Sequence, residues 1–95
     1  MKPKDFIDDE IKQYEELVIK HIKGEVDLEE LYPAKLSHAR KCEKFIYDLF
    51  DAGIFEGCNG MIMYANRQLE AIDKKYFGIY INGEFISYNF MKYNK

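Results

Sequence analysis

The chain has 95 residues, of which 47% are hydrophobic and 16% aromatic, and its formal net charge is −3. This length predicts a single globular domain over residues 1–95, and the aromatic content argues against an intrinsically disordered chain. The acidic balance argues against a nucleic-acid binder, because such proteins normally carry a strong basic excess. No apolar stretch approaches the roughly 18 residues of a membrane span, and the first residues do not resemble a signal peptide, so we expect a cytoplasmic protein.

The first expected element is a helix that begins at Asp5 and ends before Gly24. Asp5 is an N-cap candidate, because its carboxylate can accept a hydrogen bond from a free backbone N–H. Gly24 is a typical C-terminal stop. Apolar side chains recur at helical spacing and form one stripe: Ile7, Ile11, Tyr14, Val18 and Ile22.

The second expected element is a long helix between Pro33 and about Ala52. Asp27 and Glu30 form a capping-box pattern that predicts a short helical turn before it. Proline clashes inside a helix but suits its first position, so we expect a fresh helix that starts at Pro33. Its predicted buried side is Leu36, Ala39, Ile46, Leu49 and Phe50.

After the second helix, the sequence predicts a loop, a further helix and a hairpin. Residues 53–60 hold three glycines and are expected to be a loop. Residues 61–64 are either the first turn of a helix over 66–75 or the second strand of a hairpin within 54–64. Asn82-Gly83 is a strong hairpin signal and predicts a β-hairpin over 76–90. The expected fold class is therefore α+β, with about three helical segments followed by this C-terminal hairpin.

The register of that hairpin divides its side chains between two faces. One face should pack on the helices, and it carries Phe77, Ile79, Ile81, Ile86 and Tyr88. The other face carries three aromatic residues that are either covered by helices and loops or form an exposed contact patch: Tyr76, Tyr80 and Phe85. The predicted core is Ile11, Val18, Ile46, Leu49, Phe50, Ile79 and Ile86.

No motif in the sequence predicts catalysis or cofactor binding. The acids Asp8-Asp9-Glu10 are consecutive, so on a helix they point about 100° apart and cannot converge on one ion. Phosphate-binding glycine motifs and hydrolase motifs are missing. We therefore expect no enzyme and no cofactor. Four potential zinc ligands lack a short Cys-x-x-Cys spacing, and packing is the favoured interpretation for them: His21, His38, Cys42 and Cys58.

Charge is distributed unevenly along the chain. Residues 1–30 hold ten acidic residues against five lysines, whereas residues 31–47 hold four basic residues against Glu43. The plain interpretation is solvated helix faces with pairing along the helix. The alternative interpretation is an acidic face that docks on a basic protein surface.

In small size, acidity and lack of catalytic motifs, the chain resembles the orphan proteins that phages and mobile elements direct against host machinery, such as anti-CRISPR proteins. The resemblance covers general character and no aligned residue. It implies a non-catalytic inhibitor that binds a protein with a basic surface. The expected partner-binding residues are Asp8, Asp9, Glu16, Tyr76, Tyr80 and Phe85, with a homodimer through the hairpin edge as an option. Alternatives are a nucleic-acid-binding accessory protein and a small metal-dependent protein, the former using Lys35, Arg40, Lys41 and Lys44.

Overall fold

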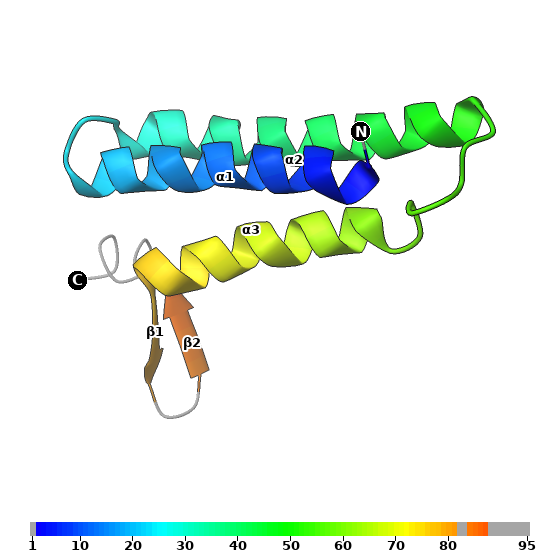
Figure 1. Ribbon diagram of the computed structural model, residues 1–95. Helices are drawn as coiled ribbons and strands as arrows, with labels where there is room; N and C mark the ends of the chain where they lie inside the picture. The colour runs from blue at the N-terminus through cyan, green and yellow to red at the C-terminus, as the bar shows by residue number, and fades with distance from the viewer. Residues whose placement is uncertain (1, 82–83, 88–95) are drawn as a thin grey trace.

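The computed structural model describes residues 2–81 and 84–87, with residues 79–81 and 84–87 described by their backbone alone. Three helices form the body of the protein: α1 (Pro3–Ile22), α2 (Leu28–Asp51) and α3 (Met61–Phe77). Each helix contacts the other two. Helices α1 and α3 run in one direction and α2 returns in the other, so the arrangement is an up-down-up bundle (Figure 1).

Helix α1 begins earlier than the sequence predicts. Pro3 lies in the first turn and Lys2 is the N-cap residue without a side-chain cap hydrogen bond, so the assignment of Asp5 as the cap is wrong. The reason is that proline has a helical φ angle and lacks the N–H that the first turn leaves without an intrahelical partner. The helix ends at Ile22, and Gly24 follows with φ of +83°, the left-handed conformation expected of a C-terminal glycine.

Helix α2 is continuous through Pro33, so the predicted turn and fresh helix at this residue are wrong. The helix starts after Asp27 and includes the segment that was expected to be separate. Leu28 and Leu31 are both buried against the other helices. Burial of these two side chains holds the first turns in line with the rest of the helix and outweighs the hydrogen bond that proline removes.

Helix α3 settles the two alternatives for residues 61–64 in favour of a helix. Gly60 is its N-cap residue with φ of +74°, and residues 54–60 contain no strand, with turns over 56–60. At its other end α3 continues past residue 75 to Phe77, which is buried in the core. Leu69, Ile72 and Tyr76 follow one another at helical spacing, so the apolar stripe extends the helix by another half turn.

The expected α+β fold class is wrong, because three packed helices form the body of the described chain. The hairpin expected over 76–90 begins only at Gly78, although its strands pair in the predicted register. Tyr76 and Phe77, which were expected to begin the hairpin, belong to α3. The backbone after α3 runs as two four-residue strands, β1 (Gly78–Ile81) and β2 (Glu84–Ser87), which are antiparallel neighbours. This ribbon extends from the end of α3 (Figure 1) and forms no layer of the bundle. Residues 88–90 lie outside the described residues.

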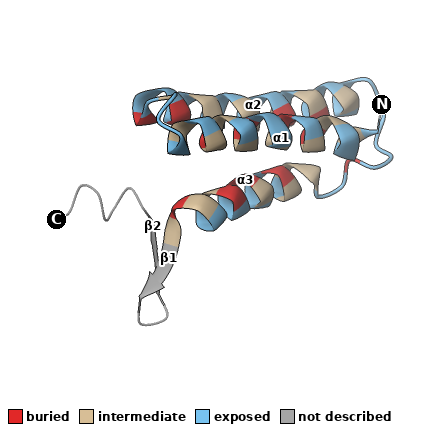
Figure 2. Ribbon diagram, turned by 60° about the vertical axis from the view of Figure 1, so that its left-hand side comes forward, coloured by how far each residue is buried: buried red, intermediate tan, exposed pale blue. Residues whose placement is uncertain are grey.

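The core consists of two clusters along the bundle axis (Figure 2). Tyr14, Val18 and Leu69 belong to one, and Ile7, Cys42 and Ile46 belong to the other. The predicted burial of Val18 and Ile46 is confirmed, and Ile11 and Leu49 are partly buried against these clusters. The side chains of Ile79 and Ile86 lie outside the described residues.

The predictions that Leu36 and Phe50 are core residues are wrong, since both are exposed. The inward stripe of α2 passes through Leu31, Lys35, His38, Cys42, Ile46 and Leu49. Leu36 follows Lys35 and therefore lies about 100° around the helix from it. Phe50 lies four residues after Ile46, at the edge of the stripe, and is exposed in the last turn of α2.

Candidate functional site

A polar layer crosses the interior between the two core clusters. Glu10 on α1 is only 6% exposed, and its carboxylate lies 3.0 Å from Nδ1 of His38 on α2. One turn further along α1, the hydroxyl of Tyr14 donates a 2.6 Å hydrogen bond to Asp73 on α3. The ammonium of Lys35 on α2 donates to the other oxygen of the same carboxylate. The layer therefore ties all three helices together through polar contacts.

This layer serves the fold. Burial, followed by the hydrogen bond to Asp73, raises the pKa of Tyr14, so its hydroxyl remains a donor at physiological pH. A buried carboxylate without a partner is costly, and the Glu10–His38 and Asp73–Lys35 pairs remove that cost. The pairings also select one relative alignment of the helices, because a shift of one turn would separate the partners.

We expect Tyr14→Phe to lower the free energy of unfolding by about 1–3 kcal/mol, because the change deletes a part-buried hydrogen bond to a carboxylate and leaves the ring in place. Denaturant unfolding of the purified variant measures the change. Tyr47→Phe is the matched control, since Tyr47 is exposed and its variant should stay within about 0.5 kcal/mol of the parent. Equal effects from the two changes would contradict the role assigned to the Tyr14 hydroxyl.

The potential zinc ligands do not converge. His38 is engaged with Glu10, and the ring of His21 is hydrogen-bonded to the carbonyl of Val26 at 2.8 Å. Within residues 2–78, whose side chains are described, no group of three or more His, Cys, Asp or Glu residues is placed to hold a metal ion. Cys42 and Cys58 are free thiols buried in the same core cluster. The structure thus uses both cysteines as small core residues.

Both thiols should resist modification while the chain is folded. Burial, with a further contribution from Glu10, raises the pKa of Cys42 to about 11, which suppresses the reactive thiolate. In Ellman's assay at mildly alkaline pH, we expect negligible reaction of the native chain and reaction of both cysteines after unfolding in denaturant. Rapid reaction of the folded chain would show that this end of the core is open to solvent.

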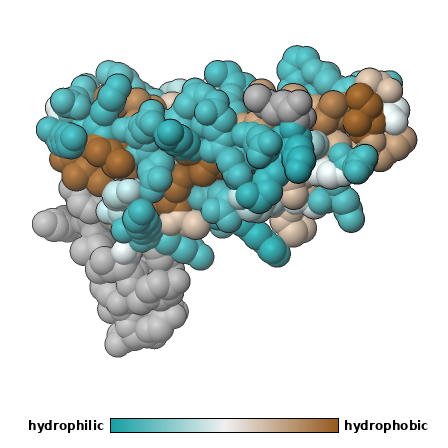
Figure 3. Space-filling model, in the orientation of Figure 1, coloured by the Kyte–Doolittle hydropathy of each residue, from teal (hydrophilic) through white to brown (hydrophobic). Residues whose placement is uncertain are grey.

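A cluster of large apolar side chains lies at the end of the bundle where α2 leads into the loop (Figure 3). Four side chains make up this terminal patch, and their exposed fractions range from 37% to 64%: Tyr47, Phe50, Ile54 and Phe55. The ring of Phe50 contacts both aromatic neighbours, with centroid distances of 6.4 Å to Tyr47 and 5.7 Å to Phe55. The three rings therefore form one continuous surface, and Ile54 directly precedes Phe55 in the chain.

The end of α2 explains why these side chains gather. Gly53 has φ of +78°, and its N–H donates to the carbonyl of Phe50, while the N–H of Ile54 donates to the carbonyl of Leu49 at 2.8 Å. These two hydrogen bonds are a Schellman motif, which reverses the chain after a helix. The reversal brings Phe55 back beside the last turn of α2. A Cβ at Gly57 would lie 3.4 Å from the ring of Pro3, so α1 starts at this same end.

The structure distributes the expected partner-binding residues over different roles. Tyr76 is partly buried, and its hydroxyl donates to Glu15 at 2.9 Å, so it helps to join α3 to α1. Asp8 accepts a hydrogen bond from Lys4 and another, 2.6 Å long, from Tyr64. The bonds from Lys4 and then Tyr64 lower the pKa of Asp8. Exposed acids of α1 remain available at Asp9 and Glu16. The side chains of Tyr80 and Phe85 lie outside the described residues.

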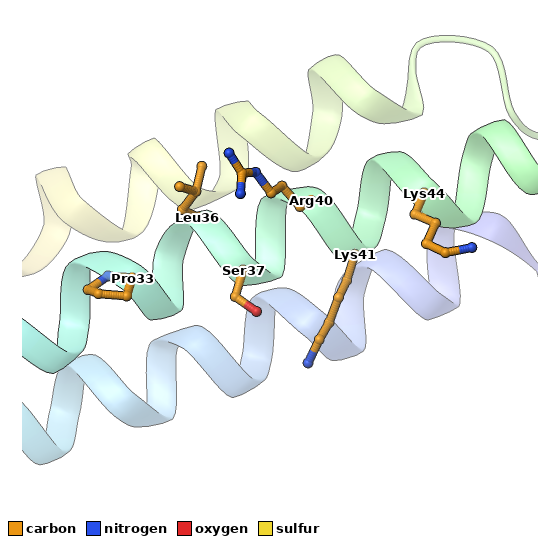
Figure 4. Close-up of a pocket in the computed structure, with 6 residues that line it drawn as sticks. All are labelled: Pro33, Leu36, Ser37, Arg40, Lys41 and Lys44. Atoms are coloured by element: carbon orange, nitrogen blue, oxygen red, sulfur yellow. The ribbon is translucent and has the colours of Figure 1, made fainter.

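The basic residues proposed for nucleic-acid binding lie along α2. A shallow hollow of about 410 Å³ follows this helix and is lined by Pro33, Leu36, Ser37, Arg40, Lys41 and Lys44 (Figure 4). Lys44 forms an ion pair with Asp48 one turn along the helix, and Lys35 forms an ion pair with Asp73 in the polar layer. Half of the proposed basic set is therefore already paired with carboxylates of the chain. Nucleic-acid binding through these residues stays a prediction.

Comparison with protein-family models, with curated proteins and with solved structures finds no match. Among the described residues, none of the helices combines the length and the apolar character that crossing a membrane requires.

Proposed function

We propose that the chain is a non-catalytic protein-binding module that docks through the terminal patch. The observation that carries this proposal is the contiguity of the rings of Tyr47, Phe50 and Phe55, which are exposed with Ile54 at one end of the bundle. Scattered exposed apolar residues are ordinary, whereas a contiguous apolar cluster is typical of an interaction site. Aromatic side chains are also enriched among the residues that dominate binding energy.

The exposed acids of α1 extend this proposal to the rate of association. Asp9 and Glu16 are exposed on α1, roughly 9 and 20 Å along the helix from Pro3, which lies beside Gly57 in the loop that carries Phe55. Their charges attract a basic partner over about one Debye length, which is roughly 8–10 Å at physiological salt and about 30 Å at 0.01 M salt. They accelerate encounter without adding much affinity.

Asp9→Lys combined with Glu16→Lys should therefore lower the association rate constant by about tenfold at low salt, with little change in the dissociation rate constant. Raising the salt concentration should reduce the difference between variant and parent. Surface plasmon resonance against the isolated partner measures both constants. A matched change at the opposite end of the bundle, Glu25→Lys with Glu29→Lys, should have a smaller effect. If both double variants slow association equally, the effect comes from the overall charge of the chain and not from the acids of α1.

Site-specific photocrosslinking tests the docking surface directly. A photoreactive phenylalanine analogue is incorporated at Phe55 in one variant and at Ile22 in the other. Both positions are exposed and apolar, and Ile22 ends α1 at the far end of the bundle. The proposal predicts a discrete crosslinked protein from position 55 and none from position 22. Crosslinks from position 22 alone, or from neither position, would refute docking through the terminal patch.

The inhibitory, anti-CRISPR-like role is a narrower proposal on the same basis. A module without catalysis of its own acts on a partner by occupying a surface that the partner needs. The crosslinked protein can be identified by mass spectrometry and its activity measured with and without the chain. Loss of that activity at stoichiometric amounts of the chain is the result expected of an inhibitor, and unchanged activity would indicate an adaptor instead.

A further inference from the structure

The terminal patch has an acidic border. Residues 47–57 contain three acidic residues and no basic residue. Asp51 and Glu56 are exposed on either side of the turn at Gly53. Asp48 is the third, and Lys44 is held against it at 2.8 Å in a solvent-exposed pair. The segment that carries the apolar cluster therefore itself bears net negative charge.

Two independent properties of this surface attract cations. Exposed carboxylates form charge-assisted hydrogen bonds with Lys and Arg. The faces of aromatic rings are electron-rich, and a cation within about 6 Å of a ring centroid is attracted to it. The chain itself shows this pairing beside its own rings, with the ammonium of Lys4 at 5.5 Å from the ring centroid of Tyr64 and that of Lys75 at 5.1 Å from that of Tyr76.

Resting on the proposed function, we propose that the partner is a protein that presents an apolar hollow flanked by Lys or Arg side chains. Phe50 and Phe55 fill the hollow, and the carboxylates of Asp51 and Glu56 pair with the flanking cations. Charge complementarity selects this occupant. A second copy of the chain would bring two acidic borders together, which like charges oppose. An anionic membrane surface would repel the same border.

Two synthetic amphipathic helical peptides provide the probe. They share one apolar stripe of Leu and Phe and differ only in their flanking residues, which are lysines in one and glutamates in the other. Each is titrated into the full-length, ¹⁵N-labelled chain while amide chemical shifts are followed. Shift changes confined to residues 47–57, with the lysine peptide binding at least about tenfold more tightly than the glutamate peptide, are the expected result.

A pair of charge-neutral variants isolates the acidic border. Asp51→Asn with Glu56→Gln should weaken binding of the lysine peptide by roughly two- to tenfold, the range for two rim charges. Glu25→Gln with Glu29→Gln removes the same charge at the far end of the bundle and should leave that affinity unchanged. If both variant pairs weaken binding equally, net charge rather than the border is responsible, and the inference is overturned.

The remaining outcomes separate this inference from the docking surface itself. Equal binding of both peptides at residues 47–57 would retain the terminal patch as a docking surface and overturn the basic partner. If the lysine peptide causes no amide chemical-shift changes at residues 47–57, the inference is also overturned. Photocrosslinking from position 55 tests the proposed function independently of this result. Self-association in sedimentation that Phe55→Ala abolishes would identify a second copy as the occupant. Partition onto phosphatidylcholine vesicles through the patch would identify a lipid surface.

Discussion

Leu69→Ala is expected to lower the free energy of unfolding by about 2–5 kcal/mol, the usual range for such a deletion in a packed core. Leu69 is 1% exposed near the middle of α3, in the cluster to which all three helices contribute. Truncation removes apolar contacts and leaves a cavity that the helices cannot fill without shifting. Because small domains are stable by only about 5–15 kcal/mol, this single change should remove a large part of the total.

Denaturant unfolding followed by circular dichroism measures this loss. Met63→Ala is the control, since Met63 lies on the same helix and is exposed. Its unfolding free energy should stay within about 0.5 kcal/mol of the parent. If Leu69→Ala costs no more than Met63→Ala, α3 does not pack against α1 and α2 through the face described.

Phe55→Ala should weaken partner binding by about 2 kcal/mol or more, which corresponds to roughly a 30-fold rise in Kd. Phe55 is 64% exposed, so its truncation removes little that the folded chain needs. Its ring lies 5.7 Å from that of Phe50, and loss of this neighbour opens the centre of the patch. The effect should appear in the dissociation rate, because local contacts act after encounter.

Ile22→Ala is the matched control for Phe55→Ala. It truncates a similarly exposed apolar side chain, 55% exposed, at the far end of the bundle. Binding kinetics with the isolated partner should be unchanged for this variant, and circular dichroism confirms the folding of both. A weaker complex with Ile22→Ala and an unchanged one with Phe55→Ala would move the interface away from the terminal patch.

Helical periodicity was the most informative signal in the sequence. The stripe of α1 was predicted from its spacing, and Ile7, Tyr14 and Val18 are buried as that pattern requires. Ile11 is partly buried, and the prediction is wrong for Ile22, which ends the helix and is exposed. Periodicity fails where a local rule interrupts it. Pro33 suggested a helix start, but tertiary burial of Leu28 and Leu31 keeps α2 continuous. A local penalty of about 3 kcal/mol is smaller than the packing of two leucines and the helix continuity that they support.

The fold class could not be predicted because a turn motif such as Asn82-Gly83 does not indicate which helices and strands pack against one another. Asn82-Gly83 favours a reversal of the chain, yet the class depends on which elements pack against one another. The helices supply those packed faces, and the stripe that ends at Tyr76 and Phe77 carries α3 through residues that were expected to form a strand. Continuing the count of apolar positions from Leu69 and Ile72 would have found this extension.

The terminal patch was missed for a related reason. Phe50 was expected inside because it follows Ile46 by four residues, but it lies in the last turn of α2 and is exposed there. The Schellman turn at Gly53 had a sequence signal, a glycine with an apolar residue after it. The polar layer was less predictable. Glu10 stands on the inner stripe of α1, and its partners come from distant parts of the chain.

Hydroxyl-radical footprinting of the chain, alone and in its complex, tests the central claim most directly. The measurement needs no variant, because exposed apolar side chains on other faces serve as internal controls. Docking through the terminal patch predicts that Tyr47, Phe50 and Phe55 lose reactivity in the complex, while Ile22 and Met63 keep theirs. Unchanged oxidation of Phe55, with protection at Ile22 or Met63 instead, would contradict it.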